Sequence, residues 1–130
     1  MSDPIHQEFS YAAAPEDIFD ALLSSQKFSE FTGATAKIDA REGGDFACFD
    51  GQIVGKTIEL VPGERIVQAW RVAAWDEGHY SLVRFTLTKN AAGTQVSLDH
   101  SAFPEGSGEH LAAGWPKMYF EPLRAYLERS

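Results

Sequence analysis

The feature that most constrains the fold is a run of short alternating segments between residues 43 and 79, separated by glycine turns. Apolar, β-branched and aromatic residues alternate with polar ones there, which is typical of strands with one buried face. Turns are indicated at Gly43-Gly44, Asp50-Gly51 and Pro62-Gly63. Asp50-Gly51 is the strongest of these, because its glycine accepts a positive φ without a Cβ clash. Connections this short exclude parallel crossovers, so we expect antiparallel strands.

Strand signals extend on both sides of this run and predict a sheet of seven strands. Six are expected between residues 35 and 103, at roughly 35–40, 45–49, 52–60, 64–72, 79–89 and 94–103. The remaining strand comes first in the chain, between Ile5 and Tyr11, where apolar side chains alternate with polar ones.

Two short helices are expected between the first strand and the second. Pro15 suits a first helical turn, and the acidic residues after it place negative charge at the positive end of the helix dipole. A second short helix carries Phe28 and Phe31 and stops at Gly33.

The last segment, from residue 105 to residue 130, has apolar residues at helical spacing and predicts a long helix. Pro116 removes one backbone donor and its ring clashes with the carbonyl of Ala112, and Pro122 repeats the problem. We therefore expect a kink, or a short leading helix followed by a main helix that begins near Trp115. This helix would lie across the curved sheet, and a functional site is expected in the space between them.

Three ordered motifs carry a resemblance to a known family. The chain reads GGDFACFDGQIVG from Gly43, LVPGERIVQAWRVAAWDEGH from Leu60, and GWPKMYFEPLRAYL from Gly114. These motifs resemble the C-terminal domain of the activator of the 90-kDa heat shock protein ATPase, over nearly the whole chain. That family belongs to the START-like, or SRPBCC, superfamily. The resemblance implies an α+β helix-grip fold, in which two short helices after strand one form a cradle and the long C-terminal helix covers the concave face of a seven-stranded antiparallel sheet.

Composition excludes several classes of partner. The length predicts a single START-like domain over residues 1–130, and a formal net charge of -8 argues against nucleic acid and against an anionic membrane surface. The single cysteine, Cys48, excludes an internal disulfide and fits a reducing compartment. Neither a signal peptide nor an apolar run of about 20 residues is visible in the sequence. We expect a soluble cytoplasmic protein that is a monomer or a weak homodimer.

Two histidines are candidates for a polar anchor in the site. His100 follows Val96 and Leu98 at even spacing, so it faces inward near a strand end. His79 is expected at the start of the strand at 79–89, and parity puts it on the cavity side as well. A core hydrogen bond is the commoner role for a buried histidine, and His79 has the alternative of capping the turn at Gly78.

Large aromatic side chains suit both a pocket and a core. Trp115 and Tyr119 lie on the predicted helix and suit either the lining of a pocket or the core, whereas Trp70 is assigned to the core. Cys48 is expected to point inward as a small hydrophobe. No catalytic residue, metal site or cofactor site is predicted, because no nucleophile with a matched base, no metal-ligand spacing and no phosphate-binding glycine loop is present.

Three functions remain open at this point. The first is a binding module that holds a small apolar or amphipathic ligand between the sheet and the helix, with six lining residues: Trp75, His79, His100, Trp115, Met118 and Tyr119. The second is a co-chaperone-like interaction protein, which the family resemblance implies. In that family the domain works with a separate N-terminal domain, which these residues do not contain, so we do not expect direct activation of an ATPase. The third, ranked last, is an enzyme that uses the cavity.

Overall fold

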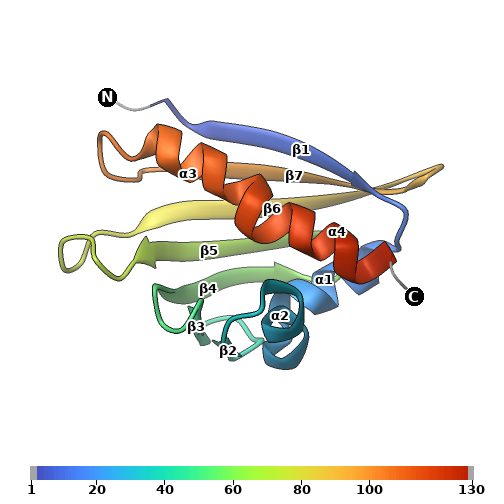
Figure 1. The fold of residues 1–130 in the computed structure, drawn as a ribbon, viewed down its shortest axis with the longest axis horizontal. Helices are drawn as coiled ribbons and strands as arrows, with labels where there is room; N and C mark the ends of the chain where they lie inside the picture. Colours follow the sequence, from blue (N-terminus) through green and yellow to red (C-terminus); the bar gives the residue numbers. More distant parts are fainter. Residues whose placement is uncertain (1–2, 129–130) are drawn as a thin grey trace.

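The centre of the structure is an antiparallel sheet of seven strands in the order β1-β7-β6-β5-β4-β3-β2 (Figure 1). This computed structural model describes residues 3–128. The strands are β1 (Ile5–Tyr11), β2 (Lys37–Ile38), β3 (Asp45–Cys48), β4 (Ile53–Val61), β5 (Arg65–Val72), β6 (Ser81–Asn90) and β7 (Gly93–Ser101). The predicted number of strands and their antiparallel pairing are confirmed, and β6 begins two residues later than expected.

One face of the sheet is apolar because side chains alternate along each strand. In β7 the buried set is Thr94, Val96, Leu98 and His100, while the residues between them are partly exposed. The register places His100 opposite Val83 of β6 and Ile5 of β1. The inward orientation predicted for His100 is therefore confirmed, and so is that of Cys48, which is 3% exposed.

Two short helices follow β1, as predicted: α1 (Pro15–Leu23) and α2 (Ser25–Thr32). Ser24 caps α2 by accepting from the backbone N–H of Lys27, and Gly33 ends it with a left-handed φ of 76°. Figure 1 shows both helices beside the C-terminal end of the long helical segment. The Tyr126 hydroxyl donates to Glu30 of α2 at 2.6 Å and links these layers.

The C-terminal helical segment crosses the apolar face of the sheet in three consecutive parts (Figure 1). These are α3 (Gly108–Gly114), the π-helical segment η1 (Trp115–Phe120) and α4 (Glu121–Glu128). Gly114 and Glu121 both have right-handed helical φ and ψ, so the backbone continues through η1 without a break. The sequence predicts a kink or a new start near Trp115, and the structure has a wider hydrogen-bond spacing there instead. The N–H of Glu121 accordingly donates to the carbonyl of Pro116, five residues earlier.

Strand β1 replaces the hydrogen bond that Pro116 removes from this helix. Pro116 cannot donate to the carbonyl of Ala112, and the side-chain amide of Gln7 donates to that carbonyl instead, at 2.8 Å. The Tyr11 hydroxyl donates to the carbonyl of Phe120 at 2.8 Å, about two turns further along. These two contacts fix η1 over the sheet, which determines the shape of the space beneath it.

Candidate ligand-binding cavity

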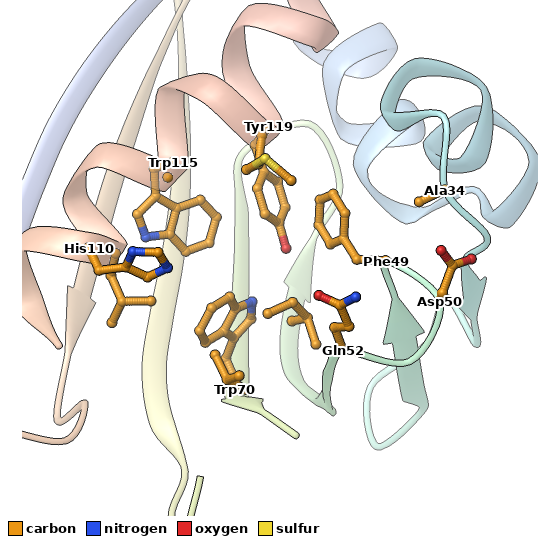
Figure 2. A pocket seen from close by; sticks show the side chains of 13 residues that line it. Ala34, Phe49, Asp50, Gln52, Trp70, His110, Trp115 and Tyr119 are labelled. Atoms are coloured by element: carbon orange, nitrogen blue, oxygen red, sulfur yellow. The ribbon is translucent and has the colours of Figure 1, made fainter. Parts of the chain in front are cut away.

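A cavity of about 360 Å³ lies between the sheet and the C-terminal helical segment, with one side open to solvent. It is bounded by β4, β5, the loop between β3 and β4, α3 and η1, and most of its walls are apolar or aromatic (Figure 2). The lining residues are Ala34, Phe49, Asp50, Gln52, Ile53, Trp70, Val72, His110, Leu111, Gly114, Trp115, Met118 and Tyr119.

The roof of the cavity is formed by two aromatic residues four positions apart on η1. Trp115 and Tyr119 share one helix face, and their ring centroids are 4.5 Å apart. Trp70 of β5 forms the floor, 5.4 Å from the Trp115 ring. Met118 is 46% exposed at the mouth, where its flexible thioether adapts to different shapes. The result is a continuous aromatic wall with an adaptable rim.

A strained loop supplies the wall opposite Trp115. Phe49, Asp50 and Gly51 have φ values of 55°, 58° and 87°, so two non-glycine residues adopt the left-handed conformation in succession. The loop is held by Asp50, whose carboxylate accepts from the Thr35 N–H at 3.0 Å and whose own N–H donates to the Thr35 carbonyl. This conformation places the Phe49 ring 5.3 Å from that of Tyr119.

Few polar groups face the cavity. The indole nitrogen of Trp70 and the hydroxyl of Tyr119 point toward each other, and the amide of Gln52 lies beside them (Figure 2). Burial, and to a lesser extent Cys48, raise the pKa of the Tyr119 hydroxyl well above its ordinary value, and a hydrogen-bond interaction with the Trp70 indole acts in the opposite direction. Among the described residues, however, the Trp70 indole nitrogen has no hydrogen-bond partner of ordinary geometry. His110 and Asp50 are exposed and belong to the rim.

His100 lies behind the cavity, in a closed hydrogen-bond chain. The Trp115 indole donates to His100 Nδ1 at 3.1 Å, so the neutral ring carries its proton on Nε2 and donates to Ser81 Oγ at 2.7 Å. The Ser81 hydroxyl then donates to the carbonyl of Trp70 at 2.8 Å. Burial lowers the pKa of His100 to about 4, which keeps the ring neutral. The structure therefore places His100 in the core beneath Trp115 and outside the set that lines the cavity.

Trp75 and His79 also lie outside the cavity-lining set. They belong to the loop before β6, which is held by Arg71, whose guanidinium donates to the carbonyls of Trp75 at 2.7 Å and of Asp76 at 3.1 Å. The ring of His79 donates a hydrogen bond from Nε2 to the Ala102 carbonyl at 3.1 Å. Because the strand starts at Ser81, the parity argument for His79 does not apply, and its ring bridges two loops instead.

The structure thus brings together three of the six predicted residues: Trp115, Met118 and Tyr119. Trp70, assigned to the core from its spacing, is both buried and part of the cavity floor. Phe49 and Gln52 were missed because their orientation depends on the positive φ values of the loop. The Asp50-Gly51 turn was the available signal, since it brings the residues beside it to the end of the sheet.

The described part of the chain offers little for metal or nucleophilic chemistry. Among residues 3–128, no group of three or more His, Cys, Asp and Glu side chains gathers closely enough to hold a metal ion. Burial raises the pKa of the Cys48 thiol to about 12, so it stays protonated at neutral pH. No helix within these residues is long and apolar enough to cross a bilayer.

Comparison with known proteins places this chain in a family context. The chain is 29% identical to human activator of 90 kDa heat shock protein ATPase homolog 1 over 88% of its length, but it spans only 34% of that relative. A Dictyostelium discoideum homologue of this activator is 28% identical over 88% of the chain and is matched over 30% of its own length. The chain therefore spans about a third of the curated relatives it matches.

Solved structures of similar size share the fold. The crystal structure of an HSP90 activator from Plasmodium falciparum has a TM-score of 0.87 and 27% identity, with 98% of this chain and 96% of that chain covered. The solution structure of an Aha1 dimer from Colwellia psychrerythraea has a TM-score of 0.84 at 19% identity, over 98% of both chains. The family model described as Activator of Hsp90 ATPase homolog 1-like protein matches residues 12–128. This chain belongs to the Activator of Hsp90 ATPase homolog 1-like family.

Proposed function

We propose that this chain is a non-enzymatic START-like domain that binds a small apolar or amphipathic molecule between its sheet and its C-terminal helix. The observation that carries the proposal is the cavity itself, about 360 Å³ of space lined mainly by aromatic and aliphatic side chains. Ligand sites in proteins are typically concave, mostly apolar, and supplied with a few polar groups that orient the ligand. Burial of apolar ligand surface against these rings would supply most of the affinity.

A glycine in the helical roof supports this reading. Gly114 lies inside the continuous helical segment with φ of -72° and ψ of -33°, a conformation that any residue adopts. A Cβ built there meets no other atom within 4 Å, so alanine would fit and would favour the helix by about 1 kcal/mol. Glycine at this lining position leaves the cavity wider than alanine would.

Native mass spectrometry of the protein purified from its source tests the proposal. A bound small molecule is expected in the wild-type protein and absent in Gly114→Leu, whose side chain fills the space at the roof. Ala113→Leu is the matched control, because it places the same side chain on the exposed neighbouring position. The proposal fails if no molecule is bound, or if Gly114→Leu retains as much of it as Ala113→Leu does.

A second candidate is binding to the chaperone Hsp90, because several relatives are named activators of its ATPase. Calorimetric titration of this chain into purified Hsp90 tests it, and measurable heat of binding with a defined stoichiometry is the expected result. Gly114→Leu should bind Hsp90 like wild type if the cavity is separate from the chaperone surface. Absence of binding would reject this candidate and would leave the proposal for the cavity unaffected. Oligomeric state stays a prediction, although one structural neighbour is described as a dimer.

A further inference from the structure

The wall of the cavity contains a buried hydrogen-bond donor that has no partner of ordinary geometry among residues 3–128. Trp70 is 3% exposed, and the only group that interacts with its indole N–H among residues 3–128 is the Tyr119 hydroxyl, which does not reach ordinary hydrogen-bond geometry. Burying an N–H group without an acceptor costs free energy, and native structures contain few such groups. Trp115 shows the contrast, since its indole N–H is paired with His100 at 3.1 Å. A buried donor without a well-formed partner, on a residue that lines a cavity, marks the place where an acceptor atom of a ligand would be stabilised.

A second donor converges on the same place from the opposite wall. The Tyr119 hydroxyl projects from η1 toward the Trp70 indole nitrogen (Figure 2). Burial raises the pKa of this hydroxyl, so it keeps its proton at neutral pH and is able to donate. One oxygen atom has two lone pairs and accepts from both groups at once. Gln52 adds an amide at the side of this point and accommodates a second polar atom.

The charges around the cavity select against ions. Neither lysine nor arginine lines it, and its rim carries the Asp50 carboxylate, so an anionic ligand would lose hydration without gaining a fixed cation. The Asp50 carboxylate is already engaged by the Thr35 N–H at 3.0 Å, and none of the inner groups is negatively charged. An organic cation therefore also lacks a partner deep in the cavity.

We infer that the cavity takes a neutral, flat aromatic molecule whose carbonyl-type oxygen accepts hydrogen bonds from the Trp70 indole and the Tyr119 hydroxyl. The inference rests on the proposed function, because it requires that the cavity binds a small molecule. The rings of Trp70, Trp115 and Phe49 form walls on which a planar molecule stacks. Trp70 and Tyr119 then determine which end of the molecule enters first.

A matched set of three probes tests the inference: 2-acetylnaphthalene, its isostere 2-isopropenylnaphthalene, and 2-naphthoate. The ketone and the alkene differ only in that a methylene group replaces the carbonyl oxygen. The naphthoate has the same ring system with a negatively charged carboxylate in place of the acetyl group. Calorimetric titration should give about tenfold tighter binding of the ketone than of the alkene, as expected for a donor that is otherwise left unpaired. The naphthoate should bind at least about tenfold more weakly than the ketone does.

Tyr119→Phe keeps the ring and removes one donor, so it should reduce the preference for the ketone to about threefold while the affinity for the alkene stays unchanged. Equal affinity for ketone and alkene in the wild-type protein would overturn the inference and leave the proposed function standing. The same holds for tighter binding of the naphthoate, or for an unchanged preference in Tyr119→Phe. Binding of none of the probes, or equal binding by Gly114→Leu, would count against the proposed function as well.

Discussion

The two sides of Trp115 differ in how completely their polar groups are paired. On the side of β6 and β7, the chain from the Trp115 indole through His100 and Ser81 to the Trp70 carbonyl leaves no donor unused. On the side of β4 and β5, the Trp70 indole N–H lacks a partner of ordinary geometry beside a cavity of about 360 Å³. A closed network favours one rigid arrangement, whereas an unpaired donor beside open space favours occupation by another molecule. The comparison distinguishes a structural histidine, His100, from a candidate ligand site on the other side of the Trp115 ring.

Removing Trp115 should have the largest effect, because this residue belongs to both sides. It is 2% exposed, contacts Trp70 and Tyr119, and donates to His100. Trp115→Ala should lower the free energy of unfolding by about 3–5 kcal/mol, since the neighbours fill such a space only in part. Urea denaturation measures this effect. A loss below about 1 kcal/mol would show that the helix does not dock on the sheet as described.

The closed side should make stability depend on pH. Folding lowers the pKa of His100 from 6.5 to about 4, so its contribution is complete above pH 6.5, falls between pH 6.5 and 4, and is absent below. By linkage, protonation of His100 should lower the free energy of unfolding by about 3 kcal/mol over this pH range. His6 acts in the opposite direction, because hydrogen bonds to Asp99 and Glu8 raise its pKa and its contribution is lost as the pH rises.

The difference between wild type and His100→Leu isolates this contribution, since His6 is present in both proteins. The variant should be less stable at pH 7, because the Trp115 indole loses its acceptor, and its stability should change less between pH 7 and pH 4. Denaturation midpoints at several pH values provide the comparison. Parallel pH profiles for the two proteins would show that His100 is not held neutral in the fold.

A smaller effect is expected where β1 supports the helical roof. Gln7→Leu removes the amide that binds the Ala112 carbonyl at 2.8 Å and should cost about 1 kcal/mol of stability. In a Pro116→Ala background the helix regains a donor for that carbonyl, so the same substitution should cost less. A double-mutant cycle measures this coupling. Additive effects would mean that the Gln7 amide does not compensate for Pro116.

The smallest effect is expected at Gly114, in the roof of the cavity. Gly114→Ala adds a methyl group where no atom lies within 4 Å and should raise the free energy of unfolding by about 0.5–1 kcal/mol, chiefly through the unfolded chain. Thermal unfolding of the purified variant measures the gain. A loss of stability would show that the roof is packed more tightly at Gly114 than the structure indicates.

Much of this comparison was accessible from the sequence, and the reasons for its limits are local. The period of two in β7 correctly turned His100 inward, and helical spacing correctly grouped Trp115 with Tyr119. Alternation does not reveal whether an inward residue meets a space or a neighbour, and here His100 meets the Trp115 indole. β6 begins at Ser81 and not at residue 79 as expected, because the Arg71 guanidinium holds the preceding loop by donating to carbonyls of that loop. Side-chain to backbone contacts of this kind have no periodic signal.

The roof shows the same limit in another form. Two prolines in a helical pattern predict an interruption, and at Pro116 a single glutamine of β1, distant in sequence, supplies the missing donor. The left-handed backbone at Phe49 and Asp50 likewise depends on pairing with Thr35, which local propensity does not indicate. The sheet and the presence of a helix across it were therefore predictable, whereas the continuity of that helix and the wall and floor of the cavity required the tertiary structure.

Hydrogen exchange of the tryptophan indole protons, followed by NMR in the absence and presence of 2-acetylnaphthalene, tests the comparison most directly. The account predicts slow exchange at Trp115 in both samples, because its N–H is bonded to His100. At Trp70 it predicts faster exchange in the free protein, about tenfold or more, and marked slowing when the ketone binds. Slow exchange at Trp70 in the free protein, unchanged by the ketone, would show that this donor is already paired within the protein and would contradict the account.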